Sequence, residues 1–400
     1  MRPGRQTALL LATCQAFYLS ASSIGTTASG LVGLTLAPTP VLATLPYSLI
    51  PLTNAAVTVP ASFLMARLGR RAGFFLGAAL GGLGGAIGAT AIFERNFLLF
   101  CLGNALWGCF QATAQYYRFA AADAVEPAYK PRAVSWVLAG GVLASVMGPE
   151  IATYAQSFVA SVQYAGSYFA ISVLSALTIL TLSFLRIPGG STAARSWTGG
   201  RPFREIARQP IFAAAVVNGV VGYSIMSFIM TASPLAAVFC GHSSTDAIGI
   251  IRWHLVGMFL PAFFTGVLVS RYGAPLVALC GTAMLVACGI IANAGTSLVH
   301  FWVALALLGV GWNFMFISGT TLLTQAYRPE ESAKVQGLNE FLIAGSAALG
   351  SLTSGGAFNL LGWDAMNLGV MPLLILAAAI TVWYALSERR LAAGNAPSAG

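Results

Sequence analysis

The stretch that decides the fold is Ser62-Phe-Leu-Met-Ala-Arg-Leu-Gly-Arg-Arg71, a short basic segment between two long apolar runs, residues 41–66 and 72–93. Its pattern recurs 204 positions later, from Gly266 to Pro275, again between two apolar runs. A second pair of segments, 123–132 and 325–334, repeats at an offset of 202 and places Pro127 on Pro329. Two matches at nearly one offset indicate that the chain consists of two related halves.

The composition indicates that both halves lie in a membrane. Apolar residues make up 57% of the 400 residues and charged residues only 8%, whereas a soluble domain carries about 25% charged residues. Backbone groups in lipid require helices or a closed barrel, and the apolar runs show no strand-like alternation. We therefore predict an all-α membrane protein whose helices need about 20 apolar residues each to cross. The twelve predicted spans are 8–36, 41–66, 72–93, 97–122, 132–158, 164–187, 211–237, 247–270, 274–295, 299–326, 333–360 and 365–387.

The distribution of basic residues predicts the orientation. Nearly all Lys and Arg residues fall in connections on one face, and the opposite connections hold only Arg95. The positive-inside rule therefore places both termini in the cytoplasm. The net charge of +9 follows from this bias and does not indicate nucleic-acid binding. The predicted domains are a six-helix half at 1–187, a Gly-, Ser- and Arg-rich cytoplasmic linker at 188–210, and a second six-helix half at 211–400.

The repeated basic segment resembles the loop motif G-x-x-x-D-R-x-G-R-R of the major facilitator superfamily. Four motif positions match: Arg67, Gly69, Arg70 and Arg71. Ala66 replaces the motif's Asp, and Ser62 replaces its first Gly. The resemblance covers essentially the whole chain. It implies a secondary transporter with two pseudo-symmetric six-helix halves in a bacterial inner membrane, monomeric, without enzymatic activity or a cofactor, in which the motif arginines act in gating or coupling.

Two pairs of side chains suggest a cargo. Met226-x-x-x-Met230 and His254-x-x-x-Met258 lie on consecutive apolar spans, and i,i+4 spacing puts each pair on one helix face. Thioethers and imidazole are ligands that a soft metal such as Cu(I) accepts. No carboxylate accompanies them within these two spans, which disfavours Mn, Mg or Ca. The alternative is that the methionines are packing residues and that the histidine is a hydrogen-bonded structural residue.

At these residues the chain resembles the CcoA-type copper importers, also called the CalT family. The resemblance implies import of copper into the cytoplasm, for a cytoplasmic acceptor and cbb3-type cytochrome oxidase assembly. It implies that Met226, Met230, His254 and Met258 carry copper and that Cys240 assists. No cysteine follows Cys288, although studied members have one near the C-terminal end. The same branch of the superfamily includes riboflavin importers.

Charged residues inside predicted spans are costly in a bilayer and point to function. Glu150 and Arg252, both in the outer parts of their spans, are predicted to pair across the halves at an outer gate, or else to reach the outer interface. Arg118 and Glu340 are predicted at similar depth near the cytoplasmic side. They suit an inner gate, a proton-coupling site or a purely structural ion pair.

Polar residues on spans 4 and 10 are predicted to line a cavity: Gln111, Gln115, Tyr116 and Asn313. Such a cavity suits a neutral heterocycle such as riboflavin as well as a hydrated path for copper. Copper import is the leading prediction, and a riboflavin-like vitamin importer is the alternative. Proton-coupled drug efflux is less favoured because Asn104 stands where drug/proton antiporters of the superfamily carry an Arg. A non-transporting membrane sensor is a fourth possibility, to be told apart by the absence of flux.

Overall fold

A computed structural model of the chain describes residues 3–39, 42, 45–158, 164–185 and 200–394. Every regular element in these ranges is a helix. The first half contains α1 (Pro3–Leu36), α2 (Leu45–Leu68), α3 (Arg70–Phe93), α4 (Phe97–Ala114), α5 (Tyr117–Asp123), η2 (Pro127–Tyr129), α6 (Lys130–Phe158) and α7 (Ala165–Ser183). The second contains α8 (Phe203–Ala207), α9 (Pro210–Phe239), α10 (Ser244–Phe259), α11 (Ala262–Tyr272), α12 (Ala274–Ala294), α13 (Leu298–Ala326), η4 (Pro329–Glu331), α14 (Ser332–Gly369) and α15 (Met371–Gly394).

Ten helical stretches in the described ranges are long and apolar enough to cross a membrane. One of them, Pro329–Glu388, contains both of the last two predicted spans. The backbone breaks within it at Gly362, whose φ of +78° is in the left-handed region. Every predicted span thus coincides with a helix or a pair of consecutive helices, and the all-α prediction is confirmed.

Two predicted spans are interrupted, which the apolar pattern did not indicate. Span 247–270 divides into α10 and α11 at Leu260–Pro261, where proline lacks the N–H that a continuous helix would use. Span 97–122 divides into α4 and α5 at Gln115–Tyr116, where the Tyr116 N–H bonds to the Thr113 carbonyl in a tighter turn. The predicted linker 188–210 lies outside the described residues up to position 199, and then includes the short helix α8.

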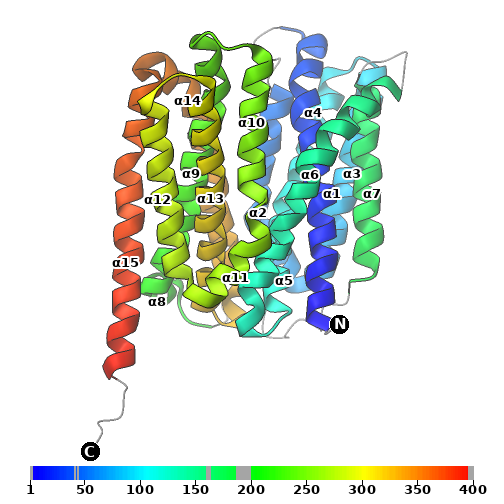
Figure 1. Ribbon diagram of the computed structural model, residues 1–400. Helices are drawn as coiled ribbons and strands as arrows, with labels where there is room; N and C mark the ends of the chain where they lie inside the picture. Colours follow the sequence, from blue (N-terminus) through cyan, green and yellow to red (C-terminus); the bar gives the residue numbers. More distant parts are fainter. Residues whose placement is uncertain (1–2, 40–41, 43–44, 159–163, 186–199, 395–400) are drawn as a thin grey trace, which may run out of the picture. The chain divides into compact units, whose positions relative to one another are not determined.

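The chain forms two compact units. Unit 1 comprises residues 1–199 and Pro329–Ala344, and unit 2 comprises Gly200–Arg328 and 345–400. The start of α14, predicted to belong to the C-terminal half, therefore packs with the N-terminal one. In unit 1, α3 packs against α4 and α7, and α2 against α4 (Figure 1). In unit 2, α12 packs against α13 and α15, and α10 against α13, which is the same set of pairings.

The repeated basic segment has the same backbone in both units. Gly69 begins α3 with φ +88° and ψ 151°, and Gly273 begins α12 with φ +87° and ψ 149°. Residues that have a side chain rarely adopt this backbone conformation, whereas glycine does so readily. The shared glycine is thus required by one sharp turn used twice, and the repeat seen in the sequence is a repeat in structure.

Candidate functional site

The four residues of the predicted soft-metal site all lie in unit 2. Met226 on α9 and Met258 on α10 are buried, with 3% and 6% of their surface exposed. Met230 is half-buried and packs against the hydrophobic core of the unit. Among the described residues, no group of three or more His, Cys, Asp or Glu side chains gathers to hold a metal ion. A metal at this position would therefore depend on the thioethers.

His254 is directed toward α13. Its ring is fully buried, and its Nδ1 lies 2.9 Å from the Leu305 carbonyl oxygen. The carbonyl fixes the ring by accepting from Nδ1–H, which leaves Nε2 as the acceptor or ligand atom. Nε2 is buried, and no hydrogen-bond partner is found for it in the described part of the chain. His254 is thus held by the packing of α10 on α13 and keeps one nitrogen available.

Cys240 lies at the C-terminal end of α9, beyond the apolar stretch Pro210–Phe239. It is half-buried and packs against the hydrophobic core of unit 2. Burial raises the pKa of its thiol, and the Asp364 carboxylate adds to the effect. The role of Cys240 in copper handling stays a prediction.

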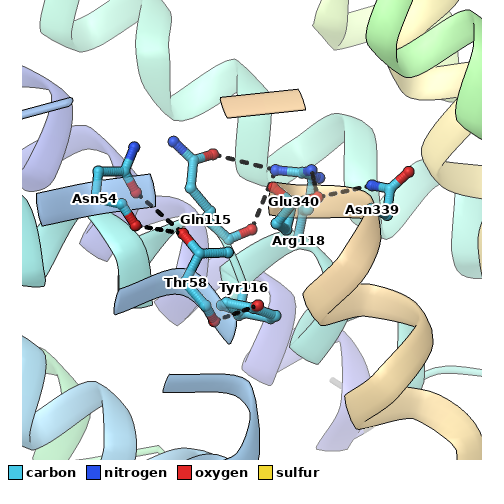
Figure 2. Close-up of polar contacts among 7 residues, drawn as sticks. All are labelled: Asn54, Thr58, Gln115, Tyr116, Arg118, Asn339 and Glu340. Carbon is cyan, nitrogen blue, oxygen red and sulfur yellow. Dashed lines mark hydrogen bonds and ion pairs between the residues drawn. The ribbon is translucent and has the colours of Figure 1, made fainter. Parts of the chain in front are cut away.

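A buried ion pair joins α5 to the start of α14 within unit 1. Arg118 Nη2 donates to Glu340 Oε1 at 2.5 Å, and each side chain is 3% exposed. Arg118 Nη1 also donates to the backbone oxygen and Oε1 of Gln115, at 3.1 and 3.2 Å. Asn339 Nδ2 donates to the same Glu340 oxygen at 2.8 Å (Figure 2). The proximity predicted for Arg118 and Glu340 is present, and its role in gating or coupling stays a prediction.

A second branch of polar contacts lies beside this pair. The Tyr116 hydroxyl donates to the Thr58 carbonyl at 2.9 Å, and Thr58 Oγ1 donates to the Asn54 carbonyl at 2.7 Å (Figure 2). Ser62 Oγ donates to the Ala333 carbonyl at 2.8 Å and so ties α2 to the start of α14. Gln115, which belongs to the first branch, and Tyr116, which belongs to the second, are consecutive residues at the interruption between α4 and α5.

The motif arginines tie the ends of helices together. Arg70 Nη2 bonds Asp123 Oδ2 at 2.6 Å and Gln336 Oε1 at 3.2 Å. Arg71 Nη2 donates to the Ser183 carbonyl at 2.8 Å, at the end of α7. Arg67 is exposed. Arg70 and Arg71 thus hold α3 to α5, α7 and α14 within unit 1.

The residues predicted to line a cavity lie in different surroundings. Asn313 is fully buried: its Nδ2 donates to the Met258 carbonyl at 2.7 Å, and its Oδ1 accepts from Thr265 Oγ1 at 2.7 Å. It therefore joins α13 to α10 and α11 instead of facing a cavity. Tyr116 is equally buried and bonded, whereas Gln111 and Gln115 are half-buried.

The predicted outer gate takes one residue from each unit. Glu150 on α6 belongs to unit 1 and Arg252 on α10 belongs to unit 2, and both are exposed. Their pairing stays a prediction.

Sequence reasoning missed a neutral polar triad in unit 1. Asn104 Oδ1 accepts from Ser29 Oγ at 2.9 Å and from the Tyr168 hydroxyl at 3.0 Å, and all three side chains are buried. The sequence signal that could have indicated this triad is the presence of one polar residue in each of three apolar spans. The position where antiporters carry an Arg is occupied here by a neutral group with hydrogen-bond partners.

The chain combines two units of apolar helices that have the same internal pairings. It also carries paired charges inside the spans. Together these features define a multi-pass membrane transporter of the secondary type. The family model described as Major Facilitator Superfamily matches residues 9–351 and 242–400. The chain belongs to this superfamily.

The chain is 39% identical over 373 residues to the riboflavin transporter RfnT of Brucella anthropi, which covers 93% of this chain and 94% of that protein. It is 30% identical over 401 residues to YdeG of Bacillus subtilis, an MFS-type transporter of uncharacterised function. Among solved structures, FucP in its outward conformation matches with a TM-score of 0.76 over 94% of this chain and 98% of that one, at 16% identity. The human organic anion transporter MFSD10 matches with 0.77 over 95% and 100%, also at 16%. These two structures support the fold alone.

Proposed function

We propose that this protein imports riboflavin or a closely related flavin across the inner membrane into the cytoplasm. The observation that carries the proposal is the 39% identity to the riboflavin transporter RfnT, which extends over more than nine-tenths of both chains. The resemblance to copper importers rested on four side chains. A similarity along the whole chain therefore favours the vitamin over the metal.

The chemistry of the chain suits a neutral heterocycle. Only 8% of its residues are charged, and the buried Arg118 and Glu340 neutralise each other. Sites for flat organic molecules are mostly apolar, with a few placed hydrogen-bonding groups. Transport would follow the superfamily's alternating access, in which the two repeats expose one site to each face in turn. We also propose that both termini are cytoplasmic and that the protein is a monomer.

Growth of a riboflavin auxotroph that lacks its own importer tests the proposal in cells. Expression of this protein is expected to restore growth at low external riboflavin, because flavin enters through it. A matched strain expressing Trp312→Leu, a variant that removes a buried aromatic ring of unit 2, serves as the transport-impaired comparison. Well-expressed protein that gives no growth advantage would contradict flavin import.

Copper import is the second candidate, and one structural observation favours it. His254 Nε2 is buried, and no hydrogen-bond partner is found for it in the described residues. A buried imidazole nitrogen of this kind suits a soft cation. By the resemblance, Met226, Met230 and Met258 would complete the ligand set, Cys240 would assist, and a cytoplasmic acceptor would receive the metal.

A Met226→Leu, His254→Ala double variant separates the two candidates. We expect the folded variant to retain riboflavin uptake within about threefold of the wild type. Leucine fills the volume of methionine at a cost below about 1.5 kcal/mol, and losing the His254 hydrogen bond to the Leu305 carbonyl lowers stability. Radioactive copper uptake is expected to be at background for both proteins. Copper uptake by the wild type that disappears in a well-folded double variant would instead establish the metal as cargo.

A further inference from the structure

The middle of unit 2 contains a cluster of four aromatic rings from three helices: Tyr223 of α9, Phe259 of α10, and Trp312 and Phe316 of α13. Trp312 and Phe316 are stacked, with ring centroids 4.8 Å apart and an interplanar angle of 16°. Tyr223 meets both rings edge-on, at 5.4 and 5.5 Å. Phe259 meets Trp312 edge-on at 6.2 Å. We call this set the aromatic cluster.

The aromatic cluster lies at the mid-length of its helices. Trp312 is the central residue of α13 (Leu298–Ala326), and Tyr223 is close to the centre of α9 (Pro210–Phe239). Phe259 is the last residue of α10, directly before the interruption at Leu260–Pro261. In helices that cross a bilayer, these positions are near the midplane. Secondary transporters hold their substrates at this depth, typically beside an interrupted helix.

A second observation points to a ligand. The Trp312 side chain is 2% exposed, and its indole Nε1–H has no hydrogen-bond partner in the described part of the chain. Buried tryptophan N–H groups usually have a partner, because an unpaired buried donor is costly. The other buried side-chain atoms of unit 2 without a described partner belong to Asn218, His254 and Ser318, which lie on the same three helices. Of these atoms, only the Trp312 N–H belongs to a ring of the aromatic cluster.

We propose that the aromatic cluster is the site that binds the flat ring of the substrate, with Trp312 Nε1–H donating to a carbonyl oxygen of that ring. The proposal rests on the proposed function, since flavin is the heterocycle concerned. Flat rings with polar edges bind by stacking on aromatic faces, and one placed donor then fixes their orientation. Tyr223 is half-buried while the other three rings are buried, so Tyr223 is the ring of the cluster that we expect the substrate to reach first.

Riboflavin titration of the purified full-length protein, followed by quenching of flavin fluorescence, tests the site. Trp312→Phe keeps a ring and removes the N–H, and we expect about fivefold weaker binding, the effect of one lost hydrogen bond. Trp312→Leu also removes the stacking face, and we expect about thirtyfold weaker binding. The matched control is Trp363→Phe, another buried indole of unit 2, which pairs with Phe301 at 5.4 Å outside the cluster. It is expected to bind like the wild type.

The outcomes separate the site from the function. Unchanged affinity in Trp312→Leu, with riboflavin bound by the wild type, overturns the site and leaves flavin transport standing. A folded wild type that binds no riboflavin overturns both. If Trp312→Leu does not fold, Trp312→Phe together with Tyr223→Leu decides the question, since wild-type affinity in both variants also overturns the site.

Discussion

Replacing Glu340 by alanine is expected to lower the free energy of unfolding by about 3–5 kcal/mol, because it leaves the Arg118 guanidinium buried without its carboxylate. Arg118 and Glu340 are each 3% exposed, so the guanidinium would stay shielded from bulk water without its partner. Asn339 would also lose its acceptor. The measurement is reversible unfolding of the purified protein in mixed micelles, with riboflavin uptake as a second readout.

A double-mutant cycle completes this experiment. The cycle compares Arg118→Leu, Glu340→Leu and the double variant that carries both changes. The double variant removes both charges, and such replacements of a buried pair are often neutral or stabilising. The double variant is therefore expected to be more stable than either single one. Arg67→Ala, an exposed arginine of the same motif region, is the control and is expected to unfold like the wild type. Wild-type stability in Glu340→Ala would contradict the buried pair.

Gly309→Leu is expected to prevent α10 from packing on α13 and to abolish a folded, transport-competent protein. A Cβ at position 309 would lie 2.5 Å from the His254 carbonyl oxygen and 2.6 Å from the Met258 nitrogen. Both are backbone atoms, so no side-chain rotation relieves the contact. Overpacking usually costs about 1–3 kcal/mol and sometimes more, and here the helix itself must move. Size-exclusion chromatography and thermal unfolding measure the effect.

The control for this prediction is Gly356→Ala on α14, where the described residues beyond its own stretch of helix place no atom within 4 Å of the added Cβ. Alanine is favoured over glycine in a helix by about 1 kcal/mol, so this variant is expected to be at least as stable as the wild type. A Gly309→Leu protein that elutes and melts like the wild type would show that α10 and α13 are not in backbone contact.

The fold could be predicted from the sequence because bilayer physics leaves few choices. Long apolar runs must form helices, and the repeated basic segment with Gly69 and Gly273 marks the two halves. The interruptions could not be predicted in the same way. Pro51, Pro60 and Pro234 lie inside continuous helices, whereas α10 ends before Pro261. Since all four residues lack the N–H, the tertiary surroundings decide which proline breaks a helix.

The candidate site was only partly predictable. The i,i+4 spacing placed His254 and Met258 on one face but did not indicate that the His254 ring bonds a carbonyl of α13. Similar depth indicated the pairing of Arg118 with Glu340, but the Asn339 contact depends on the packing of α14 with unit 1. The aromatic cluster joins rings far apart in the chain. In the sequence only the i,i+4 spacing of Trp312 and Phe316 signalled it.

The substrate prediction changes most. Four soft ligands favoured copper, while the similarity over the whole chain favours a flavin. Short motifs of common residues recur in packing, because methionine fills gaps between helices readily. Relatedness along more than nine-tenths of the chain depends on many positions at once and therefore carries more weight.

The most direct measurement is time-dependent uptake of radiolabelled riboflavin into liposomes containing the purified protein, with Cu(I) uptake measured in parallel. We predict saturable riboflavin accumulation that is competed away by unlabelled riboflavin. This accumulation is expected to be reduced in Trp312→Leu and to persist in Trp363→Phe. Copper accumulation is predicted to equal that of protein-free liposomes. Copper uptake without riboflavin uptake, by protein that is folded and correctly inserted, would contradict the proposal that the cargo is a flavin.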